Sequence, residues 1–303
     1  SDVYKRQHKY TPMRILIALL ASLMMLAGPA AIAQVTVSYA MDTPTFTLAH
    51  EDTDKYETLD TCYLNVSYQF KYRNSEKDDS LSFDDIMDLQ MGKDYNAFFS
   101  RDLRALDTQN TKELKSTMQF STIPENYVGF DLLFNHKDAL TTVTNRLPYT
   151  SQVIEYNESS ESPEWTYIPD EIATVMDYHC HVATCNYGGR NWKVYYTNDI
   201  PVPYGPWKLN GVKGLVLKAE DSENNFIFEA VGLTQKPQPI IRYDWSRKKM
   251  KKEDWKKFEQ EMYKNAGAFV RNTGARILIM DNSEQGFHRL NEDWSQYYNP
   301  LER

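Results

Sequence analysis

The alternation of apolar and polar positions predicts a chain built mainly of β-strands. Residues 62–72 alternate without a break, which is the period of a half-buried strand. One side of this strand would carry Cys62, Leu64, Val66, Tyr68, Phe70 and Tyr72. We expect shorter strands at 86–91 and 95–100, joined by the turn-forming Gly92-Lys93-Asp94, and at 128–134 and 153–156.

Two hairpins are predicted further along the chain. Residues 178–187 and 192–197 flank the four-residue loop Gly188-Gly189-Arg190-Asn191, whose composition suits a hairpin turn. Residues 215–219 and 226–231 flank a polar loop. Strands joined by such short loops are antiparallel, because parallel strands need crossovers of about a dozen residues or more.

One segment has the helical period instead. At 251–264 the apolar residues Trp255, Phe258 and Met262 recur every three or four positions, with charged residues between them. The predicted fold is therefore mainly β, with an antiparallel, strongly twisted or curved meander sheet or sheets and one amphipathic helix near the C-terminus.

The first part of the chain has the pattern of an export signal. Residues 13–33 contain one basic residue, an apolar run and the small-residue exit Ala31-Ile32-Ala33, as in a secretory signal peptide. Gln34 follows, where a lipoprotein would have Cys. We expect residues 1–12 to be an artefact of gene prediction, and 34–303 to form a single mature β-rich domain that is periplasmic or secreted and has no transmembrane span.

The charge of the mature chain narrows the choice of partner. Residues 1–33 hold four of the 34 basic residues and one of the 42 acidic ones, so 34–303 carry a formal net charge of −11. A chain this acidic is a poor ligand for nucleic acid or anionic lipid, since those polyanions bind clustered Lys and Arg. Small ligands, metal ions, envelope proteins and neutral glycans are left as candidates.

A set of short motifs resembles the GLPGLI family of exported Bacteroidetes proteins. The name-giving motif aligns with Gly211-Val212-Lys213-Gly214-Leu215-Val216, in which Lys213 replaces the proline. Other matching elements are Leu89-Gln90-Met91-Gly92-Lys93, residues 178–190, Asp199-Ile200-Pro201, Gly205-Pro206-Trp207-Lys208 and Tyr298-Asn299-Pro300-Leu301-Glu302. The resemblance implies an exported envelope protein, in some cases encoded near outer-membrane transport systems, and implies no reaction and no cofactor.

The segment 200–220 around this motif has both a structural and a functional interpretation. Its three prolines, Pro201, Pro203 and Pro206, lack backbone donors, so the segment is not a central strand. The structural interpretation is that it steers the chain between hairpins. The functional interpretation makes it a binding surface, with an aromatic platform of Tyr204 and Trp207 beside Gly211 and Gly214.

Two further groups of residues suggest chemistry. Asp177, His179 and His181 would share one face of a regular strand and are weak candidates for a zinc or copper site, although an outward polar face is the simpler expectation. In an exported protein Cys62 is a disulfide candidate with Cys180 or Cys185. A bridge between the last two needs a bulged strand, because they are too far apart on a regular one.

No catalytic motif stands out in the sequence. There is no G-x-S-x-G elbow, H-E-x-x-H, phosphate loop or dinucleotide fingerprint. The acidic residues Asp78, Asp79, Asp84, Asp85 and Asp88 are expected in a solvated loop beside a strand. We therefore expect a non-enzymatic binding or interaction protein of the cell envelope. The alternative is a hydrolase or metal-dependent enzyme whose residues converge from several strands.

Overall fold

A computed structural model describes residues 36–39, 46–75, 82–117, 127–274, 276–281, 286–289 and 294–303. The predictions for residues 1–33 and for Asp78 and Asp79 lie outside these ranges. Residues Gln34–Arg303 form one unit. The fold is mainly β, as predicted, with three helices in the described ranges.

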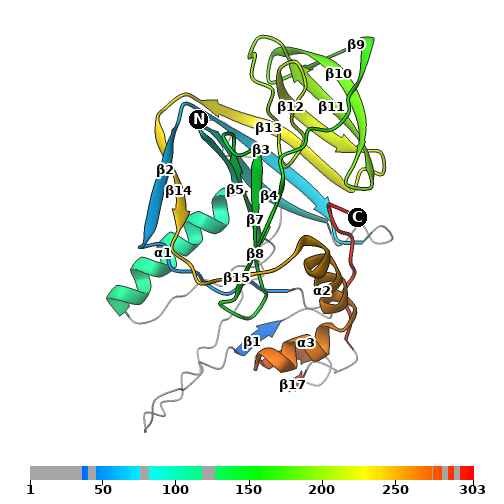
Figure 1. The fold of residues 1–303 in the computed structure, drawn as a ribbon. Coiled ribbons are helices and arrows are strands. Elements are labelled where there is room, and N and C mark those ends of the chain that lie inside the picture. Colours follow the sequence, from blue (N-terminus) through cyan, green and yellow to red (C-terminus); the bar gives the residue numbers. More distant parts are fainter. Residues whose placement is uncertain are drawn as a thin grey trace. The chain divides into compact units, whose positions relative to one another are not determined.

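A sheet of 12 strands is the main element of this unit (Figure 1). All its neighbouring strands are antiparallel except β15, which pairs with β8 in parallel. In spatial order the strands are β15 (Arg247–Lys249), β8 (Val153–Ser159), β7 (Leu140–Arg146), β6 (Phe130–Asn135), β5 (Tyr95–Ser100), β4 (Ser82–Met91), β3 (Leu64–Arg73), β13 (Phe226–Thr234), β12 (Leu215–Asp221), β11 (Arg190–Thr197), β10 (Tyr178–Tyr187) and β9 (Thr166–Val175). In Figure 1 the strands β9–β12 run steeply across β4–β8, so the sheet is strongly twisted.

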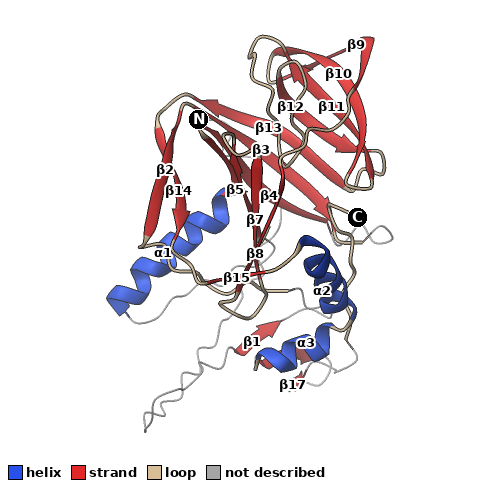
Figure 2. Ribbon diagram, viewed as in Figure 1, coloured by secondary structure: helices blue, strands red, loops and turns tan. Residues whose placement is uncertain are grey.

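One face of this sheet carries a two-stranded antiparallel sheet of β2 (Tyr56–Cys62) and β14 (Gln238–Tyr243) together with α1 (Arg101–Thr117) (Figure 2). A small core lies beneath them, formed by Cys62, Ala97, Phe99 and Ile240. Helix α1 follows β5 directly, and Ser100 begins it by accepting a hydrogen bond from the backbone N–H of Leu103 at 3.1 Å.

The other face carries the main core, α2 (Lys252–Lys264) and α3 (Ala266–Thr273). Trp255 and Met262 of α2 are buried against the sheet, as the helical period predicted. The segment 294–303, which we call the closing segment, runs beside α2 in Figure 1. A separate small sheet joins β1 (Thr36–Tyr39), β16 (Arg276–Asp281) and β17 (Gly286–Arg289).

The predicted strand at 62–72 is confirmed in its alternation but is interrupted at Tyr63. Leu64, Val66, Tyr68 and Phe70 face the main core, whereas Cys62 belongs to β2 and lies in the small core on the opposite face. The bend is held by Asp60, whose carboxylate accepts hydrogen bonds from the backbone N–H groups of Asp94 and Tyr95 at 2.6 and 3.0 Å. A Cβ on Gly92 would lie 2.5 Å from this carboxylate, so the turn needs glycine.

Both predicted hairpins are present, but the first has a shorter loop than expected. Arg190 already pairs with Tyr187, leaving only Gly188 and Gly189 in the turn, both with positive φ. Such a two-residue turn matches the twist of its strands. Helices α1 and α3 were not predicted, so two helices rather than one lie near the C-terminus. None of the helices in the described ranges combines the length and apolar character needed to cross a lipid bilayer.

Candidate ligand-binding cavity

The proline-rich segment forms a closed loop rather than a strand, as its prolines predicted. The backbone N–H of Gly211 donates to the carbonyl of Pro203, and that of Val216 donates to Tyr204. A Cβ on Gly214 would lie 2.0 Å from the Thr197 carbonyl oxygen, so this glycine allows two backbone segments to touch. The chain is thereby returned to the edge of β11, where β12 begins.

Trp207, one of the two residues of the predicted aromatic platform, belongs to the core. The residue is only 3% exposed, and its backbone has a positive φ of 54°. Its ring lies 5.7 Å from that of Trp192 and 5.6 Å from that of Tyr187. The aromatic group therefore fills the core beneath β10 and β11.

Three of the four predicted binding residues nevertheless line a small pocket. Tyr204, Trp207 and Gly211 border a space of about 200 Å³, whereas Gly214 does not. His136 also borders it, with its ring 5.3 Å from that of Tyr204 and nearly parallel to it. Burial lowers the pKa of His136, more than nearby carboxylates raise it. A binding role for these residues stays a prediction.

The closing segment is fastened to the main sheet by Arg190, which sequence reasoning assigned to a loop. Its guanidinium is buried, pairs with Asp221 at 2.9 Å and donates to the carbonyl of Pro300 at 2.7 Å. The Asn299 amide donates in turn to the carbonyl of Arg73 at 2.8 Å. Residues more than a hundred positions apart in the sequence are thus brought together.

A second attachment is a network of ion pairs around Glu302. The Lys208 ammonium lies 2.6 Å from the Glu302 carboxylate and also pairs with Glu158, which Lys252 contacts at 2.6 Å. Lys252 pairs with Glu302 as well. Burial opposes the ionisation of Glu302, but the two lysines outweigh it and lower its pKa to about 2.

The sheet, α2 and the closing segment surround a cavity of about 240 Å³, which we call the aromatic cavity. Its walls come from β3, β6, β7, β8, β13, α2 and the closing segment, and most of its side chains are apolar or aromatic. They include Phe46, Phe70, Tyr72, Phe130, Leu132, Val143, Tyr156, Phe226, Trp255, Met262, Tyr263 and Tyr298. A concave, largely apolar site with a few polar groups is typical of small-ligand binding.

Two of the polar residues on its walls, Glu259 and Asn145, are distinctive. Glu259 of α2 accepts a hydrogen bond from the Tyr298 hydroxyl at 3.0 Å, and burial raises the pKa of its carboxyl to about 7. Asn145 of β7 is 9% exposed, and within the described ranges its amide nitrogen has no hydrogen-bond partner. Besides Glu302, which is paired with lysines, the cavity therefore offers the carboxyl of Glu259 and one unused amide donor.

Sequence reasoning placed neither polar residue in a site. Glu259 lies four residues after Trp255 and three before Met262, so it belongs to the same helical stripe and could have been recognised there. Asn145 lies on a strand that was not predicted, because Thr141 and Asn145 interrupt the apolar alternation around Val143.

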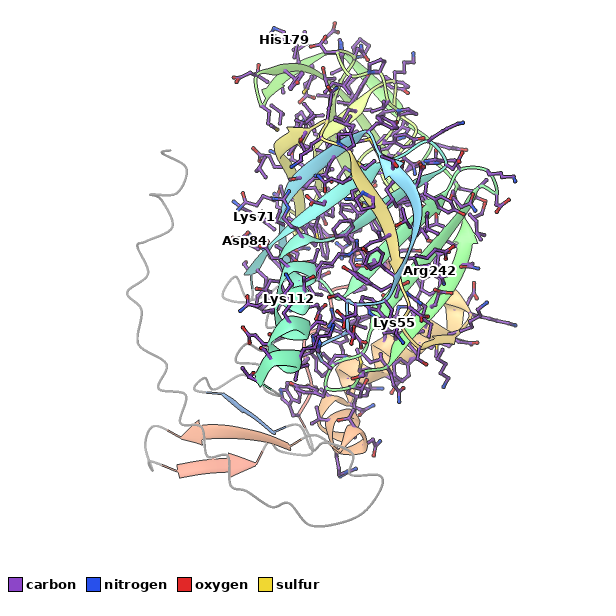
Figure 3. The ribbon with its side chains drawn as sticks, turned by 90° about the vertical axis from the view of Figure 1, so that its left-hand side faces the viewer. Lys55, Lys71, Asp84, Lys112, His179 and Arg242 are labelled. Carbon is purple, nitrogen blue, oxygen red and sulfur yellow. The ribbon has the colours of Figure 1, made fainter. Side chains whose placement is uncertain are left out.

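The weak metal candidates do not come together. Met176 and Asp177 form the two-residue turn between β9 and β10, both with positive φ, so Asp177 does not share a strand face with the histidines. His179 and His181 are exposed, and Figure 3 places His179 at the end of the molecule away from the helices. No group of three His, Cys, Asp or Glu suited to a metal ion occurs within the described ranges.

The predicted disulfide is also not formed. Cys62, Cys180 and Cys185 are all buried free thiols. Cys62 belongs to the small core under β2, whereas the other two belong to the main core, so the sheet separates the proposed partners. Burial raises the pKa of all three thiols.

The described acidic residues form part of a strand rather than a solvated loop. Only Asp84 is exposed, beside Lys71 on the neighbouring strand (Figure 3). Asp85 is buried and accepts hydrogen bonds from the Ser100 hydroxyl at 2.9 Å and the Val128 N–H at 2.8 Å. Asp88 pairs with Arg101 at 2.5 Å. These carboxylates hold β4 to neighbouring segments.

Comparisons with known proteins add little to this description. No protein-family model matches the chain, and no curated protein matches it. Among solved structures it is similar to PNGF-II in two crystal forms, with 14% sequence identity and TM-scores of 0.43 and 0.42. The match covers 68% of this chain and 34% of PNGF-II, so the chain spans about a third of that protein.

Proposed function

We propose that this protein is an exported binding protein of the cell envelope that holds a small, largely apolar ligand in the aromatic cavity. The observation that carries the proposal is the cavity itself, about 240 Å³ walled by aromatic side chains between the sheet and α2. An apolar cavity of about 150 Å³ is enough to hold benzene, so this one accommodates a ligand of one ring or slightly more.

The closing segment supports the same proposal. It contributes Tyr298 and Glu302 to the wall, and Arg190 and the lysines around Glu302 hold it in place. A wall fixed in this way presents a preformed site, which reduces the entropy lost when a ligand binds. Export is supported by the signal-peptide pattern at 13–33 and by the GLPGLI resemblance.

The experiment is an NMR titration of the purified protein with toluene. Chemical-shift changes should concentrate on β6–β8 and α2. Val143→Phe, which places a ring into the cavity from β7, should abolish them. Val231→Phe adds the same volume at an exposed position of β13 and should leave them unchanged. Shift changes that survive in Val143→Phe would place binding elsewhere and refute the proposal.

A further inference from the structure

We propose that the ligand of the aromatic cavity is a neutral molecule with an apolar body and one carbonyl-type acceptor, which the Asn145 amide binds. This inference rests on the proposed function, because it concerns the same cavity. It names the chemical class of the ligand and one residue that determines specificity.

Asn145 is placed for this role by the register of the sheet. In β7 it lies two residues after Val143, so both side chains are on the same face and both line the cavity. Its neighbours on the adjoining strands are Phe130 of β6 and Ile154 of β8. The amide is therefore surrounded by apolar side chains.

The amide nitrogen of Asn145 is a buried hydrogen-bond donor for which the described residues supply no acceptor. It has no hydrogen-bond partner among the residues that the structure describes, although Asn145 is more than nine-tenths buried. A buried donor without a partner is destabilising, and such groups are rare in native proteins. A ligand acceptor at this position would satisfy it.

The charges around the cavity favour a neutral acceptor over a carboxylate. The cationic side chains on its described walls are Arg146, Lys208 and Lys256. Arg146 pairs with Asp107 at 2.6 Å, Lys208 pairs with Glu302, and Lys256 donates to the carbonyl oxygen of Arg303 at 2.9 Å. A buried carboxylate ligand would find these cations already engaged, and an uncompensated charge is strongly disfavoured in an apolar site.

The test compares two probes of equal shape. Acetophenone carries a carbonyl oxygen, and isopropenylbenzene has a CH₂ group in its place. Calorimetric titration gives both dissociation constants for the wild-type protein and for Asn145→Leu, which keeps the side-chain volume and removes the amide. Asn145→Ala serves the same comparison if the leucine variant does not fold.

In the Asn145→Leu variant, the affinity for acetophenone should fall by about 5- to 10-fold more than the affinity for isopropenylbenzene, as expected for the loss of one buried hydrogen bond. An unchanged ratio of the two dissociation constants, with isopropenylbenzene still bound, would overturn the role of Asn145 and leave the cavity as a binding site. Binding of neither probe to the wild-type protein would overturn both proposals.

Discussion

Replacing Glu302 with Gln should destabilise the protein by about 3 kcal/mol at neutral pH. The Glu302 carboxylate is 17% exposed and contacts Lys208 and Lys252. These contacts, against the opposing effect of burial, lower its pKa from 4.5 to about 2. A shift of about 2.5 pH units corresponds to about 3 kcal/mol at about 1.4 kcal/mol per unit.

The same shift fixes how the effect depends on pH. Because folding lowers the pKa of Glu302, its stabilisation is fully present above the unfolded value of 4.5 and is lost as the pH falls toward 2. The Gln variant lacks this titration. The difference in the free energy of unfolding between the two proteins should therefore shrink to about 2 kcal/mol at pH 3.5.

Urea unfolding followed by tryptophan fluorescence, from pH 7 to pH 3.5, measures this difference. The matched control is Glu164→Gln, at an exposed glutamate that forms no ion pair with the described part of the chain, where we expect a change within about 0.5 kcal/mol. A Glu302→Gln effect below about 1 kcal/mol at pH 7, or one that stays constant with pH, would show that the lysines do not stabilise the carboxylate as inferred.

Two further predictions concern the glycines and the thiols. Gly214→Ala should destabilise the protein by about 2 kcal/mol or more in the same urea assay, because its Cβ would overlap the Thr197 carbonyl. The control is Gly274→Ala, whose Cβ meets nothing, so that stability should fall only by the strain of its positive φ, about 1 kcal/mol. Equal effects of the two substitutions would contradict this reasoning. Intact-mass measurement after alkylation of the unfolded, unreduced protein should find three modified cysteines, and any pair resistant to alkylation would contradict the free thiols of the structure.

Strands such as β3, β4 and β5, and the helix α2, were predictable because their side chains follow a single period. Helix α1 was not, although Ser100 and Asp102 are a recognisable start. The face it buries contains Asp107, Asn110 and Thr111, so its stripe is not apolar. Asp107 is buried because Arg146 and the backbone N–H of Glu51 pair with it, and local sequence does not reveal partners so distant.

The candidate site was only partly predictable for the same reason. The sequence singled out the loop containing Tyr204, Trp207 and Gly211, and these residues do line a pocket. The larger cavity depends on which segments lie across from one another. Asn145 and Tyr298 become neighbours of one space only through strand order and the path of the closing segment.

The attachment of the closing segment also has a consequence for the order of folding. Arg190 sits in a hairpin whose strands are adjacent in sequence and form early, yet its acceptors on Asn299 and Pro300 follow 109 and 110 residues later. In a chain that emerges N-terminus first, this buried guanidinium stays incompletely paired until Asn299 and Pro300 have been synthesised. The wall that the closing segment gives to the aromatic cavity is thus completed only after residues 294–303 have been synthesised.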